Sequence, residues 1–512
     1  MLKKFFALLF IAAAFGFVAF NARTMSAAAA DAPTFSNEVV RIFQRNCQVC
    51  HHAGDIAPFS LMSYQEARPY ASRIKEKTAS REMPPWKPVP GCGEFEGERR
   101  LTDEEIDTVA RWVNAGAPEG NSSDLPEPLR FDGGWTIGQP DLVLQPDADY
   151  TVKPGNDVYR CFSIPTDLRG DRYVSAVEIK PGNREVVHHV IIYLDTTGES
   201  KRLDDADPEP GYTSFGGPGF AATGTLGGWA PGARARYEPD GNGWLLPKDA
   251  RVVIQVHYHP HTADSETDRT QIGLYFARKP IVKDIQVLPL INTNFSIPAG
   301  DPHYRVTALA IIPPGANAHI LGIAPHMHLL GREMNVEARL PNGTTECLIN
   351  IDDWDFHWQG VYYYKEPVAI TPFTQLSLTA YYDNSVNNPR NPNYPPKTVT
   401  WGEQTTDEMC IAFFLFTLDG LNHTPSLPQL NDVSVDTNGR LIVSGRGFSA
   451  GADILIDGER VRDTVNHKKK KKAEKQLISK EDWQRLAPPG KQVMVSVLNT
   501  DGVTTATLSF MR

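Results

Sequence analysis

Residues 324–331 read APHMHLLG, and this stretch is typical of a β-strand that places two histidines on one face. Side chains two positions apart on a strand point to the same side of the sheet. His326 and His328 can therefore hold one metal ion between their rings. The alternative interpretation is that the two histidines stand together on a surface by chance.

Two further groups of histidines lie upstream in strand-like sequence. His188 and His189 fall inside an apolar run, where burying two polar rings without bonding partners would be unfavourable. Neighbouring strand residues point to opposite faces, so both rings reach one ion only where the strand is irregular. The second group contains His257, His259 and His261, which are too many for a single site. His257 follows the phase of its strand, whereas the other two flank a proline.

The sequence around these histidines consists of short β-branched runs separated by turns. Runs such as Val186–Leu194, Arg251–Tyr258 and Gln375–Tyr382 predict strands. Many strands of this kind with turn residues between them predict antiparallel β-sandwiches. The whole stretch is long for one sandwich, so we expect two, at 135–285 and 286–424.

The C-terminal residues 427–512 predict a third β module. Its short alternating runs, with a turn at Gly445–Phe448, resemble the immunoglobulin-like modules known as IPT/TIG, which implies a further β-sandwich. Five consecutive lysines, Lys468–Lys472, fit the solvated tip of a hairpin. The alternative for this run is a contact with an anionic surface.

The N-terminal part, residues 33–120, has a helical pattern. Helices are predicted over Phe35–Ile42, Tyr64–Ala79 and Thr102–Ala115, the last with a capping threonine and a glutamate three positions on. Residues 121–134 are polar and rich in proline and glycine, as linkers are. We therefore expect a multidomain, mainly β protein with a small α-helical domain in front.

This helical part contains the sequence CQVCH at residues 47–51, which is the attachment pattern of a c-type haem. The thiols of Cys47 and Cys50 would bond the porphyrin vinyl groups, and His51 would be the proximal iron ligand. We expect one covalent haem c. The alternative is a redox-active cysteine pair followed by a histidine by chance.

The second axial ligand of the haem must come from farther along the chain. Met83 and Met62 are the main candidates, and His52 is a third. Residues 33–120 resemble a cytochrome c module of the kind with an MPPW segment, and the matching methionine is Met83. A thioether ligand raises the haem potential and suits electron transfer.

Residues 1–30 have the pattern of a secretory signal peptide. Lys3 and Lys4 precede an apolar stretch, Phe5–Phe20, and small residues follow, which predicts cleavage near Ala28 or Ala30. The apolar stretch is short for a membrane span, so we expect no stable membrane insertion after cleavage. The alternative is an uncleaved anchor. The mature protein is then periplasmic or secreted, in a compartment where disulfides persist.

The formal net charge of the chain is −10 at pH 7. A chain with this excess of acidic groups repels a phosphate backbone, and the single lysine run is too short to reverse the effect. We therefore expect no nucleic-acid partner.

Four histidine or methionine motifs together resemble the copper type II, ascorbate-dependent monooxygenases, the family of peptidylglycine α-hydroxylating monooxygenase and dopamine β-monooxygenase. The resemblance covers about 280 residues, and the motifs stand in the order of the family. These motifs are Val187-His188-His189, Gln255-Val256-His257-Tyr258, His326-Met327-His328-Leu329-Leu330-Gly331 and Asp407-Glu408-Met409-Cys410.

The resemblance implies two copper ions with separate roles. It assigns the electron-storing copper to His188, His189 and His257. It assigns the oxygen-binding copper, at the catalytic site, to His326, His328 and Met409. The ligand chemistry agrees, because a thioether suits Cu(I), whereas zinc sites use imidazole, thiolate and carboxylate.

The function implied is that of an exported copper monooxygenase, with the reaction R–H + O2 + 2e⁻ + 2H⁺ → R–OH + H2O on a small organic molecule. The fused haem would supply the electrons, and ascorbate, another external reductant or a separate donor protein is the alternative source. Family members that hydroxylate peptides hold the peptide carboxylate at places where this chain has Ala324, Ile411 and Phe413. An apolar or aromatic substrate therefore fits better than a peptide ending in glycine.

Two other functions fit parts of the sequence. A non-catalytic haem and copper electron-transfer or copper-binding protein would have the same ligands without a substrate pocket. A haem-tethered protein that binds a glycan or a protein surface would depend on the C-terminal module.

Four cysteines remain beyond the haem motif, and they allow three pairings. The resemblance pairs Cys410 with Cys347, which would fix the strand next to Met409. Cys92 and Cys161 would then form a bond that ties the haem module to the first copper domain. The alternative for this second pair is two buried thiols.

Overall fold

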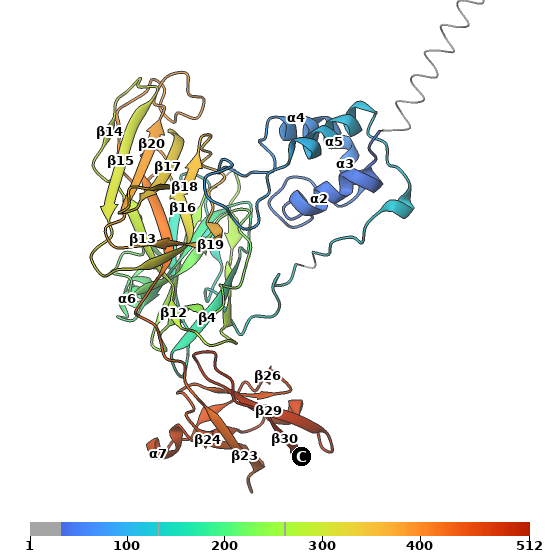
Figure 1. Cartoon of the computed structure of the whole chain (residues 1–512), viewed down its shortest axis with the longest axis vertical. Helices are drawn as coiled ribbons and strands as arrows, with labels where there is room; N and C mark the ends of the chain where they lie inside the picture. The colour runs from blue at the N-terminus through green and yellow to red at the C-terminus, as the bar shows by residue number, and fades with distance from the viewer. Residues whose placement is uncertain (1–31, 132, 261–262) are drawn as a thin grey trace, which may run out of the picture. The chain divides into compact units, whose positions relative to one another are not determined.

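The computed structural model describes residues 32–131, 133–260 and 263–512. It divides into two compact units. The first takes the described residues up to Trp86 and then Gly97–Gly134, and the second takes Lys87–Glu96 and Trp135–Arg512. The first unit is helical and the second is almost entirely β-structure, which confirms a mainly β protein (Figure 1). The predicted signal peptide, 1–30, lies outside the described residues.

The first unit is a small group of helices around an aromatic core. Its elements are η1 (Phe35–Val39), α2 (Val40–Asn46), α3 (Tyr64–Ala67), η2 (Arg68–Tyr70), α4 (Ala71–Ala79), α5 (Asp103–Asn114) and η3 (Ser122–Asp124). Phe43 and Trp112 meet edge to face, with 6.3 Å between ring centres. The predicted capping motif of α5 is confirmed, because Thr102 and Glu105 bond each other's backbone N–H groups.

The second unit begins with two five-stranded sheets, which we call the first sheet pair. One sheet has the order β1 (Leu142–Leu144), β11 (Gln271–Phe276), β4 (Arg172–Lys180), β8 (Asn242–Leu246), β12 (Lys283–Asp284). The other has the order β6 (Tyr212–Thr213), β3 (Val158–Pro165), β9 (Arg251–Tyr258), β5 (Val187–Asp195), β7 (Gly224–Trp229). Beside them lie β2 (Tyr150–Val152), β10 (Glu266–Asp268) and α6 (Glu199–Ala206).

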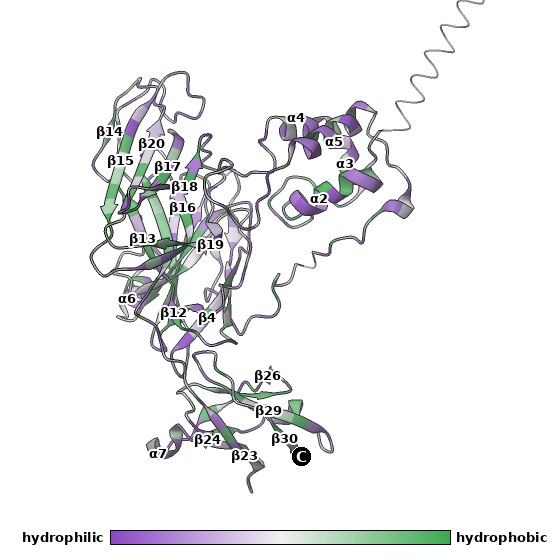
Figure 2. Cartoon of the chain, in the orientation of Figure 1, coloured by the Kyte–Doolittle hydropathy of each residue, from purple (hydrophilic) through white to green (hydrophobic). Residues whose placement is uncertain are grey.

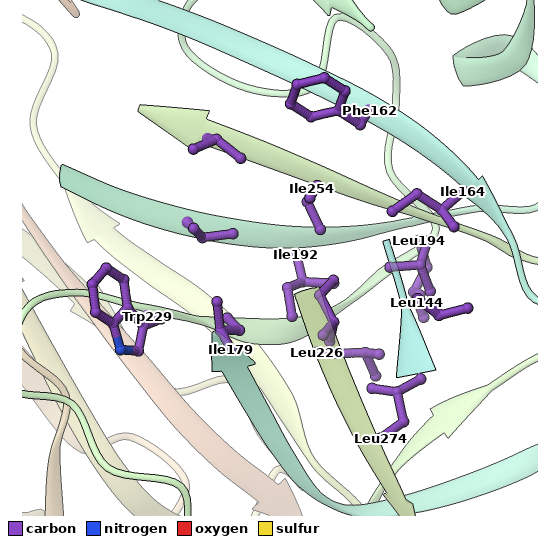
Figure 3. Packing of buried hydrophobic residues seen from close by; sticks show 14 of the residues in the cluster. Leu144, Phe162, Ile164, Ile179, Ile192, Leu194, Leu226, Trp229, Ile254 and Leu274 are labelled. Carbon is purple, nitrogen blue, oxygen red and sulfur yellow. The ribbon is translucent and has the colours of Figure 1, made fainter. Parts of the chain in front are cut away.

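The two sheets of this pair share one apolar core. Figure 3 shows side chains of both sheets in it, among them Leu274 of β11 and Ile192 and Ile254 of the facing sheet. Burying one side chain of this size contributes about 1.5–3 kcal/mol to stability. The core therefore fixes β5 and β9, the two strands that carry His188, His189 and His257.

Two four-stranded sheets follow, which we call the second sheet pair. Their orders are β13 (Gln286–Ile291), β22 (Ile411–Leu418), β16 (Ala318–His326), β19 (Tyr362–Ile370) and β15 (Tyr304–Ile311), β20 (Gln375–Tyr382), β17 (Gly331–Arg339), β18 (Thr345–Ile351). Two short strands, β14 (Ser296–Ile297) and β21 (Val399–Thr400), pair beside them. Leu321 and Leu415 of this pair belong to the core of the first sheet pair, so the two sheet pairs pack on a common apolar interface.

The C-terminal residues form a third group of two four-stranded sheets. They have the orders β23 (Gln429–Val435), β24 (Leu441–Arg446), β28 (Gln476–Ser479), β27 (Val465–Asn466) and β26 (Glu459–Arg460), β25 (Asp453–Ile456), β29 (Gln492–Leu498), β30 (Leu508–Met511). The short helices are α7 (Lys470–Ala473) and α8 (Trp483–Leu486). A buried ion pair of 2.9 Å between Arg172 and Asp453 joins this group to β4.

Hydrophobic and hydrophilic residues alternate along many of these elements, and Figure 2 shows both colours on single strands and helices. In β20 the buried residues are every second one, from Leu376 to Tyr382. This period places one face of a strand in a core. Among the described residues, no helix has the length and the hydrophobicity that a membrane span requires.

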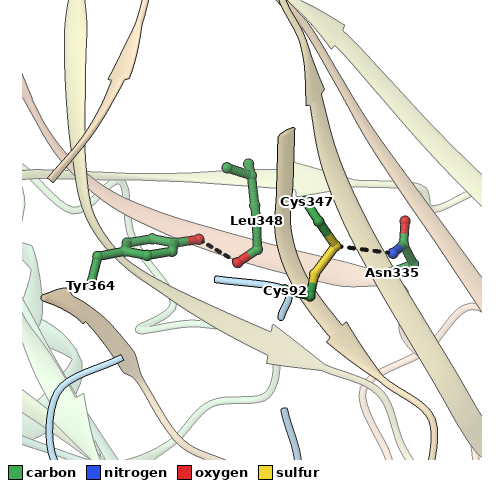
Figure 4. Close-up of a disulfide and its surroundings, with 5 residues drawn as sticks. All are labelled: Cys92, Asn335, Cys347, Leu348 and Tyr364. Atoms are coloured by element: carbon green, nitrogen blue, oxygen red, sulfur yellow. Dashed lines mark hydrogen bonds between the residues drawn. A yellow bond between two sulfur atoms is a disulfide. The ribbon is translucent and has the colours of Figure 1, made fainter. Parts of the chain in front are cut away.

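The structure corrects the predicted disulfides. Cys92 is bonded to Cys347, with 5.1 Å between their Cα atoms (Figure 4), whereas Cys161 and Cys410 are separate buried thiols. The expected pairs Cys347–Cys410 and Cys92–Cys161 are therefore wrong. The reason is that the segment Lys87–Glu96, which contains Cys92, packs with the second unit, which contains Cys347.

Backbone contacts hold this segment, which we call the strap, against two strands of the second sheet pair. Pro88 bridges Ile351 at the end of β18, and Phe95 bridges Tyr364 of β19. The N–H of Lys365 donates to the carbonyl of Glu94 at 2.9 Å. Cys347 lies on β18, so the strap brings Cys92 to Cys347 and away from Cys161 on β3.

Candidate metal centres

The CQVCH sequence forms a turn directly after α2. Its two cysteines are thiols in the structure. The Nδ1 of His51 lies 3.0 Å from the carbonyl oxygen of Phe59, and a donated hydrogen bond there leaves Nε2 as the nitrogen for a ligand bond. Burial lowers the pKa of His51, which favours the neutral ring that binds a metal.

The candidates for the second haem ligand lie in different surroundings. Met83 follows α4, and its N–H donates to the carbonyl of Lys77 at 3.0 Å. The ring of His52 stacks on Phe131 with 3.9 Å between centres, and its Nε2 lies 3.3 Å from Asp55. Because these contacts already occupy the ring of His52, a methionine is the better candidate for the second haem ligand. The choice of Met83 over Met62 stays a prediction.

The structure brings His188, His189 and His257 together, and we call them the histidine triad. One ligand atom of each lies within 4.8 Å of the others. The Nδ1 of His189 is 3.2 Å from that of His188 and 3.4 Å from that of His257. His189 and His257 face each other on β5 and β9, and the pairing is irregular between Val187 and His189. This irregularity explains how the rings of two neighbouring residues on one strand can reach the same point.

The chemistry of the triad fits a metal ion. Burial, followed by the neighbouring His257, lowers the pKa of His188 to about 3. Burial also holds the pKa of His189 well below its usual value. Burial lowers the pKa of His257 as well, so three neutral rings bring their Nδ1 atoms close together. The buried Nε2 of His188 has no hydrogen-bond partner among the described residues. Neutral imidazoles in this arrangement are suited to bind a cation.

Asp157, which precedes β3, connects the triad to the second sheet pair. Its carboxylate lies 3.2 Å from Nε2 of His257, 2.5 Å from Nδ1 of His259 and 2.6 Å from Oγ1 of Thr405. Burial opposes ionisation, but hydrogen bonds from the two histidines and the threonine hold the pKa of Asp157 well below its usual range. An Nε2 facing a carboxylate leaves Nδ1 of His257 for a metal. His261 lies outside the described residues.

His326 and His328 form the second group, at the end of β16. Their ring centres are 5.2 Å apart and the rings are perpendicular. The Nδ1 of His326 lies 2.5 Å from Oε1 of Gln359, and that of His328 lies 3.1 Å from the carbonyl oxygen of Asp407. Both contacts direct Nδ1 away from a metal and leave Nε2 as the ligand atom. Burial, followed by the charge of His326, lowers the pKa of His328 to about 3.

One buried glutamate, Glu408, ties the backbone of Met409 to that of His328. Glu408 accepts the N–H of His328 at 2.9 Å and of Met409 at 3.2 Å on one oxygen, and that of Leu330 at 2.6 Å on the other. Burial raises the pKa of Glu408, and these N–H groups oppose the rise. The structure therefore ties the two segments that carry His328 and Met409 to one side chain. We call His326, His328 and Met409 the methionine site.

We expect Glu408→Gln to weaken metal binding at the methionine site by about 10- to 100-fold, the range for outer partners of metal ligands. The amide NH2 would face a backbone N–H, which costs about 1–3 kcal/mol of folding free energy. Isothermal metal titration and chemical unfolding measure the two effects. Glu403→Gln, a change on the same loop, is the control. Unchanged affinity in Glu408→Gln would contradict the role given to this carboxylate.

Sequence reasoning missed three side chains that orient the histidines. Asp157 lies 100 residues before His257, and Gln359 lies in a loop after β18. Glu408 belongs to the motif Asp407–Cys410, but no role was predicted for it. Glu408 is the last polar residue before the apolar run Met409–Phe416, and no stronger local signal identifies it. We find no local signal for the other two.

Parts of the chain are similar in sequence to known proteins. Residues 285–427 match the family model of the copper type II ascorbate-dependent monooxygenase, C-terminal domain. "DBH-like monooxygenase protein 1" of Homo sapiens is 24% identical over 298 residues, which cover 54% of this chain and 46% of that protein. "Dopamine beta-hydroxylase" of Bos taurus is 25% identical over 225 residues, which cover 40% of this chain and 36% of that protein.

The chain therefore spans less than half the length of the curated relatives it matches. Among solved structures, PNGF-II covers 54% of this chain and 65% of its own at 9% identity and a TM-score of 0.22, which does not establish a shared fold. The family match includes His326, His328 and Met409. Over residues 285–427 the chain is thus similar to the C-terminal domain of the copper type II ascorbate-dependent monooxygenases.

Proposed function

We propose that the protein is an exported copper-dependent monooxygenase that hydroxylates a C–H bond of a small organic substrate with O2 and receives electrons through a fused c-type haem. The observation that carries the proposal is the histidine triad, in which three neutral rings bring their Nδ1 atoms close together. The similarity of residues 285–427 to the copper family's C-terminal domain supports the same conclusion for the methionine site.

The two donor sets fit copper. Imidazole nitrogens suit both oxidation states of copper, and a thioether favours Cu(I). Copper bound there would supply one-electron redox chemistry with O2. Residues of the chain prepare the sites, because Gln359 and the carbonyl of Asp407 orient the rings of His326 and His328. Asp157 does the same for His257.

Apolar residues surround His326 on its face of the sheet, which supports an apolar or aromatic substrate. Ala324 pairs with Phe413, and His326 pairs with Ile411, on the neighbouring strands β16 and β22. Residues two apart on a strand share a face, so all four side chains lie on one side. No charged group stands among them to hold a carboxylate.

The N-terminal unit supports a fused electron donor. Cys47, Cys50 and His51 would hold the haem, with Met83 as the second ligand. Only three residues separate Met83 from Lys87, where the strap begins. Backbone bonds and the Cys92–Cys347 disulfide fix the strap to the second sheet pair. The same disulfide supports export to an oxidising compartment, the periplasm or the exterior.

We also interpret the sheet pairs as the sandwiches of two copper domains, 135–285 and 286–424, and the third group, 427–512, as an immunoglobulin-like module. Residues 33–120 would be the cytochrome c domain, with the strap as its extension onto the second copper domain. The short linker 121–134 would join the first two domains.

Metal and haem analysis of the purified full-length chain tests the proposal. We expect one covalent haem and two copper ions per chain, and Cys47→Ala to remove covalent haem while leaving copper in place. Oxygen uptake should match hydroxylated product when apolar substrates are screened. Stoichiometric zinc without copper retention would contradict the proposal, and reoxidation without any product would favour a non-catalytic electron carrier.

A further inference from the structure

The loop between β18 and β19, residues 352–361, contacts both histidine groups. Its Trp354 donates from Nε1 to the carbonyl of His328 at 3.2 Å, and its Gln359 contacts His326. Between these two residues lies Phe356, whose side chain is only 6% exposed. The loop therefore touches the methionine site at two places and carries a buried ring between them.

The ring of Phe356 lies against one histidine of each group. It stacks on His188 of the triad, with 5.0 Å between ring centres and 16° between planes. It meets His328 of the methionine site edge to face, at 5.9 Å and 87°. Both geometries are the favourable arrangements of aromatic pairs. One ring thus joins the two groups.

We propose that Phe356 couples the histidine triad to the methionine site, so that a metal bound at one site raises the metal affinity of the other. The inference rests on the proposed function in one respect, namely that both sites hold copper. Phe356 is a positioning residue in this role, because it binds no metal itself and acts through His188 and His328.

The coupling follows from what each ring must do to bind a metal. A ligand histidine has to adopt one orientation, and a metal ion fixes it there. A fixed His328 limits the positions of Phe356, and a fixed Phe356 limits those of His188. The ordering required for the second metal is then partly complete, which is positive cooperativity, and linkage makes the effect equal in both directions.

Other contacts keep Phe356 in place, so that it transmits the constraint. The side chain of Arg390 donates to the carbonyl of Trp354 at 2.7 Å, and Lys87 of the strap pairs with Asp353 at 2.8 Å. The two sheet pairs share apolar core residues and the bond between Thr405 and Asp157. The two sites therefore lie across a packed interface.

A double-mutant cycle on metal affinity tests the coupling. The full chain, with haem attached and copper removed, is titrated anaerobically with Cu(I) against a competing chelator. Four proteins are compared: the natural chain, Phe356→Leu, His328→Ala and the double variant. We expect His328→Ala to weaken Cu(I) binding at the remote triad by about 3- to 10-fold, the range that one aromatic contact supports.

The same His328→Ala change should leave the triad's affinity unchanged when Phe356 is already leucine. Phe356→Tyr keeps the ring and should keep the coupling. Phe448→Leu removes another buried ring, in the C-terminal module, and should change neither site. The Cu(II) hyperfine splitting of the triad should shift in Phe356→Leu and stay unchanged in Phe448→Leu, which separates an effect on His188 from a general loss of stability.

Two results would overturn the inference. If the natural chain binds two copper ions and the effects of Phe356→Leu and His328→Ala on the triad simply add, the coupling is wrong while the proposed function stands. If the natural chain binds fewer than two copper ions, the proposed function fails and the coupling fails with it.

Discussion

Replacing Met409 or His326 by alanine is expected to reduce hydroxylation by more than about 100-fold. Even an outer partner of a ligand contributes about 10- to 100-fold, so the loss of a ligand costs more. Copper content should fall from two ions to one per chain, because the triad lies on other strands, β5 and β9. Product formation and metal analysis of the same preparations measure both effects.

The triad variants should behave differently. His188→Ala or His257→Ala should bind substrate normally and yet stop turnover, because the second electron of each cycle is then missing. Single-turnover product yield and substrate binding separate the two classes of variant. His303→Ala, at an exposed histidine of the second sheet pair outside both groups, is the matched control. Equal loss of substrate binding in all four variants would contradict this division of labour.

Local patterns in the sequence predicted most of the elements correctly. The run Arg251–Tyr258 is β9 and Gln375–Tyr382 is β20, because alternating burial is readable along a single strand. The predicted helix Tyr64–Ala79 is broken into three pieces at a proline, Pro69. A proline inside a helical pattern lacks the N–H that continues the helix.

The candidate sites were predictable as sets of residues but not as geometry. The motifs named all three histidines of the triad, whereas the irregular pairing that turns His188 and His189 to one point depends on the partner strand. A bulge of this kind leaves no mark in a single sequence. The positions of Asp157 and Phe356 depend in the same way on how distant segments pack.

The disulfide shows the same limit most clearly. Cys92 and Cys347 are 255 residues apart, and four cysteines allow three pairings. The pairing depends on the strap, Lys87–Glu96, which follows the helical residues in sequence but pairs with β18 and β19. No local preference within ten residues indicates which sheet they will join.

The strap changes the covalent attachment on which the predicted route of electrons was based. The haem was expected to be tied to the first copper domain by Cys92 and Cys161, but the disulfide attaches the strap to β18. The loop that follows β18 carries Phe356, which stacks on His188. Our prediction therefore remains that the triad is the first acceptor of electrons from the haem, reached through the strap and this loop.

We therefore expect the reduced haem to be oxidised in step with product formation. Stopped-flow mixing of the fully reduced protein with O2 and an apolar substrate measures both. Haem oxidation should slow by at least about 100-fold in His188→Ala, since the triad then lacks a ligand. Ascorbate or another small reductant would be the donor if the haem stayed reduced through a complete turnover, and the fused-donor proposal would then be wrong.

The disulfide supplies the control for this experiment. Cys92→Ser leaves a thiol on Cys347 but keeps the backbone bonds of the strap, among them Val89 N–H to the carbonyl of Asn350 at 2.8 Å and Glu96 N–H to the carbonyl of Tyr363 at 2.8 Å. Haem oxidation should therefore slow much less in Cys92→Ser than in His188→Ala. If haem oxidation slowed equally in both variants, its rate would depend on the covalent bond. The proposal that the triad is the first electron acceptor would then be wrong.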